Sequence, residues 1–86
     1  MALSRQKVLR RLNGLEDAVL WHLNEHVPET IAVAPTAIAY WRVEVTGFLN
    51  DMERLAASAN LGRKTSTEWQ GRIAELRSRL DDLLGG

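Results

Sequence analysis

The feature that most constrains the fold of this chain is a long apolar stripe of helical period in the middle of the sequence. Alternating intervals of three and four residues place all its members on one side of an α-helix, as in helices that pack side by side. The stripe predicts a helix over about 36–60 that buries one face along its whole length. Its members are Ile38, Trp41, Val45, Phe48, Met52, Leu55 and Ala59.

A similar stripe precedes it and predicts a first helix over about 4–26. Ser4 stands at the expected N-cap, where a hydroxyl accepts from a free backbone N–H of the first turn. Pro28 disfavours helical geometry at the residue before it, so this helix is expected to end just ahead of it. The positions on the predicted core face are Val8, Leu12, Leu15, Val19, His22 and His26.

A third helix is predicted over about 66–84. Thr65 and Glu68 have the spacing of a capping box, in which the two side chains satisfy free backbone N–H groups at the start of a helix. Gly85 and Gly86 follow the last apolar residue and mark the end. The positions expected to face the core are Trp69, Ile73, Leu76, Leu80 and Leu83.

Short connectors make neighbouring helices antiparallel, so the sequence predicts an all-α, up-down-up three-helix bundle in one domain over residues 1–86. No segment alternates as a β-strand does. Two alternatives remain open. One is a long helical hairpin that completes its core in a dimer, and the other is a single bent helix over 36–84.

Each connector carries its own expectation. Leu61 and Gly62 are expected to end the second helix, with the glycine in a left-handed conformation. The first connector, PETIAVAP at 28–35, is too apolar for a solvated linker. It is therefore expected to lie across one end of the bundle with Ile31 and Val33 turned inward.

Composition narrows the function classes. The chain contains no cysteine, so disulfides, thiolate metal sites and cysteine nucleophiles are excluded. No apolar run approaches the length of a membrane helix, and Glu16 and Asp17 interrupt the only segment with the order of a signal peptide. A cytoplasmic protein that makes no contact with membranes is therefore expected.

The net charge is zero, but the antiparallel order separates charges along the bundle. At the basic pole, basic residues outnumber acidic ones. The basic residues are Arg5, Lys7, Arg10, Arg11, Arg54, Arg63, Lys64 and Arg72, and the acidic residues are Asp51, Glu53 and Glu68. At the acidic pole, acidic residues outnumber basic ones. The acidic residues are Glu16, Asp17, Glu25, Glu29, Glu44, Glu75, Asp81 and Asp82, and the basic residues are Arg42, Arg77 and Arg79. Both poles are interpreted as solvated surface. The alternative is contact with an acidic partner through Arg5, Lys7, Arg10, Arg11, Arg63 and Lys64.

The start of the second helix is apolar nearly all round, which is typical of a helix that is covered on two sides. One small bundle covers only one of them. The residues left over define what we call the second apolar face, and they are Trp21, Ala39, Tyr40, Val43 and Gly47. Aromatic residues are enriched at the centres of protein interfaces, so this face is predicted to bind protein. The alternative is that Tyr40 and Val43 cover the first connector within one chain.

His22 and His26 share a helix face at a spacing that suits two ligands of one zinc ion. A zinc site needs further ligands, and the residue after His22 is Leu23 where zinc proteases of this pattern have a glutamate. Both histidines are instead interpreted as structural groups that cap the bundle end and bond the backbone of the connector. No metal ligand or cofactor is predicted.

No catalytic residue is predicted. Ser58 and Ser66 have no histidine near them as a base, and Asp81 and Asp82 are neighbours on a surface rather than carboxylates facing each other across a cleft. The expected function is a non-enzymatic interaction module, such as an adaptor, inhibitor or assembly subunit. Its expected partners are a second copy of itself, as a homodimer, and a larger protein. The alternative is nucleic-acid binding through the basic pole, against which the sequence pI of about 6.7 argues.

Overall fold

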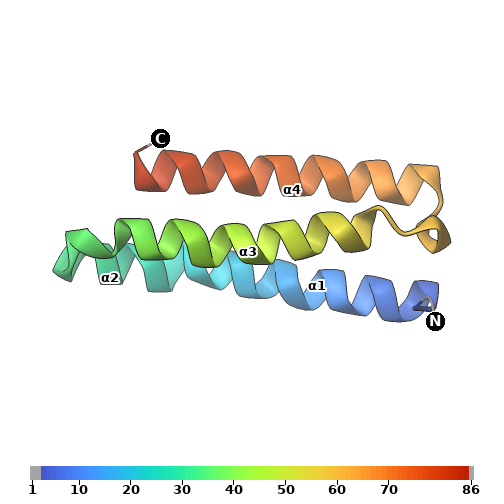
Figure 1. The fold of residues 1–86 in the computed structure, drawn as a ribbon, viewed down its shortest axis with the longest axis horizontal. Helices are drawn as coiled ribbons and strands as arrows, with labels where there is room; N and C mark the ends of the chain where they lie inside the picture. The colour runs from blue at the N-terminus through green and yellow to red at the C-terminus, as the bar shows by residue number, and fades with distance from the viewer. Residues whose placement is uncertain (1–2, 86) are drawn as a thin grey trace.

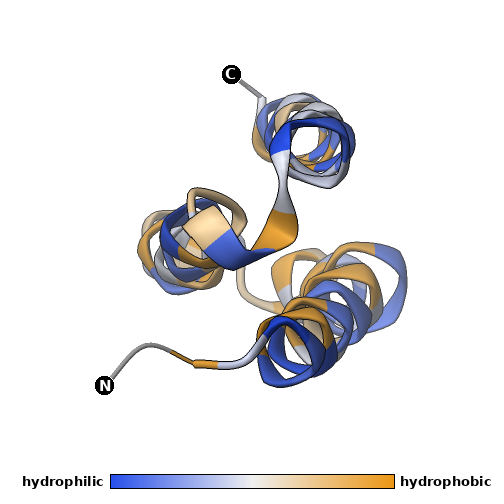
Figure 2. Cartoon of the chain, turned by 90° about the vertical axis from the view of Figure 1, so that its right-hand side faces the viewer, coloured by the Kyte–Doolittle hydropathy of each residue, from blue (hydrophilic) through white to orange (hydrophobic). Residues whose placement is uncertain are grey.

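The computed structural model describes residues 3–85, and within them the chain is an all-α bundle that runs up, down and up. Figure 1 shows three long rods side by side, and the end-on view in Figure 2 places them at the corners of a triangle. The second rod, α3, packs against both α1 and α4. The bundle measures 42 × 20 × 17 Å. The predicted fold class is confirmed.

The first rod is longer than predicted, because Pro28 does not end it. The helix α1 spans Arg5–Trp21, a π-helical turn spans His22–His26, and α2 continues over Val27–Val33. A proline inside an α-helix lacks an N–H and clashes with the carbonyl four residues earlier. The wider π turn ends two residues before Pro28, and the backbone N–H of Val27 bonds the carbonyl of His22 there.

The expected apolar connector across the bundle end is therefore wrong. Residues 28–33 are helical, and only Ala34 separates α2 from the short 3-10 turn η2 at Pro35–Ala37. Ile31 is half-buried, whereas the side chain of Val33 is 87% exposed instead of turned inward. Ser4 does cap α1 as predicted, because its hydroxyl accepts from the backbone N–H of Lys7 at 3.3 Å.

The second and third rods are joined at a sharp bend, which excludes the single bent helix. The helix α3 spans Ile38–Ala56, the 3-10 turn η3 spans Ala59–Leu61, and α4 spans Arg63–Leu84. Gly62 between them has a φ of +78°, which favours glycine, and Gly85 ends α4 with a φ of +82°. The predicted positive φ at Gly62 is confirmed, but the predicted helix end is wrong, because α3 already ends at Ala56 and Gly62, with a ψ of 161°, directly precedes α4.

The predicted capping box of the third helix is wrong. The helix α4 begins at Arg63, two residues before Thr65, and it has no side-chain cap. The hydroxyl of Ser66 instead donates to the carbonyl of Ala56 at 2.5 Å. This bond ties the first turn of α4 to the end of α3 and so fixes the angle of the bend.

The buried residues of each rod recur at intervals of both seven and eleven residues, so the core does not follow a pure seven-residue repeat. Val8 recurs as Val19 in the first rod, and Trp41 recurs as Met52 in the second. Eleven residues in three turns correspond to about 3.67 residues per turn, slightly more than the 3.6 of an α-helix, whereas seven in two turns correspond to slightly less. The buried residues are Val8, Leu12, Val19, Leu23, Val27, Trp41, Val45, Leu49, Met52, Ala56, Leu61, Trp69, Ile73, Leu76, Leu80 and Leu84.

The observed buried residues differ from the predicted core at several positions. In α3, Leu49 and Ala56 are fully buried, while their predicted neighbours Phe48 and Leu55 are only half-buried. Near the end of α4, Leu84 is buried where Leu83 was predicted. Phe48 and Leu55 lie at the edge of the α1/α3 contact, where they remain accessible from outside the bundle.

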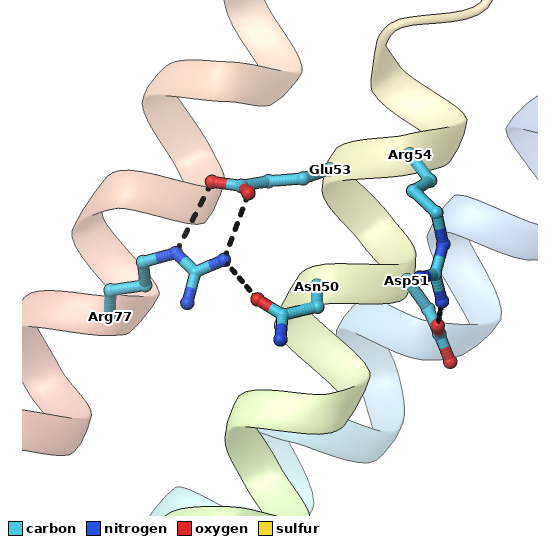
Figure 3. Close-up of polar contacts among 5 residues, drawn as sticks. All are labelled: Asn50, Asp51, Glu53, Arg54 and Arg77. Carbon is cyan, nitrogen blue, oxygen red and sulfur yellow. Dashed lines mark hydrogen bonds and ion pairs between the residues drawn. The ribbon is translucent and has the colours of Figure 1, made fainter.

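Polar side chains bridge α3 and α4 along their outer edge. Figure 3 shows Arg77 reaching from α4 to two residues of α3. It bonds Glu53 at 3.1 Å and Asn50 at 2.9 Å, and near the end of α4 Asp81 pairs with Arg42 at 3.1 Å. All five side chains are at least partly solvated, so each pair contributes little stability but helps fix how the helices align.

Candidate interaction surface

All five residues of the second apolar face are exposed in the folded chain. The exposed fraction is 48% for Trp21, 59% for Tyr40 and 75% for Val43. These three and Val33 are the large apolar residues with exposed side chains among the described residues. Tyr40 and Val43 do not cover a connector, because the segment that was expected beneath them is part of α2.

The shape of the bundle explains this exposure at the end where α2 turns into α3. The helix α4 stops at Leu84, close to the pairing of Asp81 with Arg42. Figure 1 shows that α2 and the first turn of α3 extend beyond this point as a pair of helices without a third. Apolar residues at the start of α3 therefore lack the neighbour that covers the rest of the helix.

Trp21 and the two histidines belong to a connected cluster of rings. The ring of Trp21 stacks on that of His26 at 4.6 Å with an interplanar angle of 14°. His26 meets Trp41 edge-on at 4.7 Å, and Trp41 in turn contacts Tyr40 at 4.9 Å. The chain of contacts links the exposed rings at both ends to the buried Trp41. The aromatic part of the second apolar face is thereby held in place from beneath.

His22 lies under the same cluster and joins α1 to α3. Its ring centroid is 5.4 Å from that of Phe48 and 5.5 Å from that of Trp41. Its Nδ1 lies 2.7 Å from the carbonyl of Ala18, one turn earlier in the same helix, so in this tautomer the N–H donates to that carbonyl. The histidine thus bonds its own helix rather than the backbone of a connector, which corrects the predicted partner.

Within residues 3–85, no group of three or more histidine, aspartate or glutamate side chains comes together as a metal site would require. The rings of His22 and His26 lie 5.6 Å apart and nearly perpendicular, each against a tryptophan. The position of each imidazole is accounted for by these ring contacts, which makes the pair part of the packing beneath the second apolar face.

One polar atom of the cluster has no partner. The indole Nε1 of Trp41 is buried and makes no hydrogen bond within the described chain. An unpaired buried N–H costs about 1–3 kcal/mol. Trp41 is only 9% exposed and carries the rings of both His26 and Tyr40. Burial of its large ring and support of the exposed aromatic residues outweigh the unmade hydrogen bond.

The contact between α1 and α3 leaves an open hollow nearer the other end of the bundle than the ring cluster. It has a volume of about 590 Å³ and is lined by Arg11, Gly14, Leu15, Asp51, Arg54 and Leu55. A shallower hollow of about 340 Å³ follows along α3 and shares Asp51 and Arg54 with the first. The second one reaches Val43 and Gly47. Together they form a groove along α3 that meets the second apolar face at Val43 and Gly47.

The sequence pattern missed the residues of this hollow. Leu15 and Leu55 were assigned to the core, but both are half-buried and their outer edges remain accessible. The available signal was the spacing of Gly14, Ala18 and Trp21, which places two small residues on the same helix side as an exposed tryptophan. Small side chains leave room above the larger ones beneath them.

The basic pole is partly occupied by contacts within the chain. The guanidinium of Arg5 donates to the carbonyls of Asn60 and Leu61 and, at 3.2 Å, to the hydroxyl of Thr65. Arg72 pairs with Glu16 at 2.8 Å and covers the ring of Trp69 at 4.1 Å. Arg5 therefore has a structural role within the chain, and its contact with an acidic partner stays a prediction.

The remaining predicted contact residues of this pole lie at the surface. Lys7, Arg10, Arg11, Arg63 and Lys64 are exposed, and none forms an ion pair within residues 3–85. Arg11 alone among them lines the larger hollow. The pole is thus a set of separate surface cations, of which one borders the hollow.

Two further findings bear on the class of protein. No helix among the described residues combines the length and the apolar character that crossing a membrane requires. Comparisons with protein-family models, with curated proteins and with solved structures find no match to the chain.

Proposed function

We propose that this chain is a non-enzymatic protein-interaction module that self-associates through the second apolar face. The observation that carries the proposal is the exposure of Trp21, Tyr40 and Val43 on a small bundle, beside a groove that Val43 and Gly47 line. Contiguous exposed apolar residues of this kind mark interaction sites, because water contact with them is unfavourable.

The support beneath the face favours binding over accidental exposure. Trp21 and Tyr40 are each held against a buried or half-buried ring, at 4.6 Å from His26 and 4.9 Å from Trp41. Side chains that are already ordered lose little conformational entropy when a partner binds. Fixed aromatic residues at the centre of a polar surround are typical of the residues that dominate binding energy.

The proposal includes a contact with a larger protein, as in an adaptor, inhibitor or assembly subunit. Small helical bundles of bacterial and phage origin have this form, which is an analogy of shape alone. The lack of cysteine fits a reducing compartment, so we place this function in the cytoplasm.

Nucleic-acid binding by the basic pole has weaker support. Arg5, Arg54 and Arg72 already contact carbonyl or carboxylate oxygens of the chain. The overall charge is zero, whereas the phosphate backbone selects a strongly positive surface. Binding of this kind would weaken steeply with salt, unlike an apolar contact.

The proposal predicts that Tyr40→Glu together with Val43→Glu yields a folded monomer. Two carboxylates on the face would have to be desolvated in any complex, while both positions are exposed in the single chain. The measurement is molar mass by light scattering, with circular dichroism as the check on folding. Val33→Glu is the matched control, since it adds a charge at an exposed apolar residue outside the second apolar face. An associated double variant would contradict the proposed surface.

A further inference from the structure

The α1/α3 side of the bundle carries both a projecting ring and an open hollow. Tyr40 is 59% exposed and lies towards the end where α2 turns into α3. The hollow of about 590 Å³ lies towards the opposite end, between residues 11–15 of α1 and 51–55 of α3. Its volume falls within the range of about 300–1,000 Å³ for pockets that enclose small molecules, so it has room for an aromatic side chain.

The ring and the hollow lie at equal distances from the middle of this side. Gly47 follows Tyr40 by seven residues and precedes Arg54 by seven, so each lies about 10 Å from it at 1.5 Å per residue. In α1, Trp21 follows Gly14 by the same interval. His22 contacts both Phe48, at 5.4 Å, and Trp41, at 5.5 Å, so the adjacent Trp21 lies level with the part of α3 between these two residues, which includes Gly47. The side is therefore centred on these two residues.

This arrangement is complementary to itself. Consider a two-fold axis that lies between two copies, at right angles to the helices and at the level of Gly47. Rotation about this axis places the α3 helices of the two copies against each other in antiparallel directions. The α1 side of one copy then faces the α1 side of the other. Each Tyr40 then meets the hollow of the other copy. The same contact forms twice, which is the defining property of an isologous dimer.

We propose that the hollow binds Tyr40 of a second copy of this chain, in an antiparallel two-fold dimer centred on Trp21 and Gly47. The inference rests on the proposed self-association and specifies its geometry. In the dimer the two Trp21 rings lie near the axis, and Gly47 lets the two α3 helices approach closely. Formation of the dimer fills the hollow of each copy and at the same time covers the exposed Tyr40 ring of each copy.

The chemistry of the hollow suits a phenol. Its floor is apolar, from Leu15 and Leu55, and its rim carries the guanidinium groups of Arg11 and Arg54. A cation within about 6 Å of an aromatic face is attracted to it. Asp51, at the same rim, accepts hydrogen bonds and pairs with Arg54 in the single chain. Figure 3 shows this pair on the side of α3 turned away from Arg77 and α4.

The charge layout favours this orientation of the second copy. An antiparallel dimer places the basic pole of each copy beside the acidic pole of the other. At the groove itself, Arg11 and Arg54 line one end, and Glu44 lies beside Val43 at the other. The parallel arrangement would bring like poles together and leave each Tyr40 facing another Tyr40. Opposite charges thus select the orientation that also fills the hollow.

Complementary variants test the contact between ring and hollow. Tyr40→Ala removes the ring, and Gly14→Trp fills the hollow, since a side chain at Gly14 meets open space. Each variant alone should weaken dimerisation at least tenfold. An equimolar mixture should recover it, because the ring of one chain enters the open hollow of the other, and the added indole faces the missing ring. Gly71→Trp on α4 is the matched control, also in open space, and should dimerise like the parent.

A cysteine pair provides a second readout in a chain that has no cysteine of its own. Tyr40→Cys with Gly14→Cys should give a covalent dimer on oxidation. Within one chain the two positions lie on opposite sides of the centre, much farther apart than the Cα separation of about 4.4–6.8 Å that a disulfide allows. Tyr40→Cys with Gly71→Cys should give far less cross-linked product.

The possible outcomes separate this inference from the proposed function. A parent that dimerises, with both single variants unaffected or with no recovery in the mixture, overturns the contact between Tyr40 and the hollow but leaves self-association intact. A parent that is monomeric overturns both. Recovery of the dimer in the mixture, together with the cross-link, supports this geometry over any other surface.

Discussion

The two ends of the bundle are held by different forces. At the closed end, where the start of α1, η3 and the start of α4 meet, polar groups join the segments. Arg5 bonds the carbonyl of Leu61 and the hydroxyl of Thr65, and the side chain of Asn60 bonds the carbonyl of Leu3. At the open end, where α2 turns into α3, rings stack on one another and remain half-exposed.

The comparison shows which end of the bundle satisfies its polar groups and buries its apolar residues within one chain. The closed end satisfies its free carbonyls within the chain and buries Leu61 almost completely. The open end has only two helices, so the apolar residues at the start of α3 have no third neighbour. A chain of 86 residues buries little surface in proportion to its size, and leaving rings exposed adds to this cost unless a partner covers them.

The largest expected contrast is between a core residue and an exposed residue of the same helix. Leu49→Ala should lower the free energy of unfolding by about 2–5 kcal/mol, because Leu49 is fully buried in α3. Val43→Ala should change it by no more than about 0.5 kcal/mol in the monomer, because Val43 is 75% exposed. Chemical denaturation at low protein concentration measures both. A large loss from Val43→Ala would show that the open end is part of the core.

A smaller loss is expected when the ring cluster loses its histidines. Replacing His22 and His26 together by Gln should cost at most a few kcal/mol, because the change removes ring contacts and one hydrogen bond to Ala18. Zinc is predicted to be unnecessary for folding. Stoichiometric zinc that survives dialysis, with a loss of helicity on chelation, would contradict this. Thermal unfolding with and without a chelator is the measurement.

The smallest loss is expected at the closed end. Arg5→Met keeps most of the side-chain length but removes the donors to Asn60, Leu61 and Thr65. We expect a loss of about 1 kcal/mol, because part of this contact is exposed to water. Lys7→Met is the control, an exposed cation two residues later, and should stay within about 0.5 kcal/mol of the parent. Equal effects of the two changes would show that Arg5 contributes only charge.

Helical period was enough to predict the fold but not to predict which side of each helix lies deepest. The predicted and observed cores share Trp41, Val45 and Met52, then diverge at Phe48 and Leu55. A seven-residue repeat and an eleven-residue repeat share several positions over three turns and separate only over a longer stretch. Which positions lie deepest depends on where the other two helices pack, and the apolar pattern of one helix does not contain that information.

The sequence did not predict the extension of the first rod past Pro28, for a different reason. Proline usually ends a helix, but the π turn at 22–26 allows the chain to continue past Pro28. That turn is stabilised by ring contacts of His22 and His26 with residues of α3. These contacts join residues far apart in the sequence, so local rules for proline do not anticipate them.

The second apolar face shows the opposite case. Its five residues were identified by asking which apolar positions a small bundle leaves uncovered, and all five are exposed in the structure. The adjoining hollow escaped the same reasoning, since it depends on half-buried residues such as Leu15 and Leu55. Exposure follows from a pattern on one helix, whereas a hollow requires the relative position of two.

Molar mass in solution tests the central claim most directly. Sedimentation equilibrium of the unmodified chain across the micromolar range should show a reversible monomer–dimer equilibrium, with the dimer favoured as concentration rises. Added salt should weaken an apolar contact only modestly, since screening acts on the pairing of the poles alone. A mass that stays at the 9.7 kDa of a single chain at every concentration would contradict the claim that the second apolar face binds a second copy.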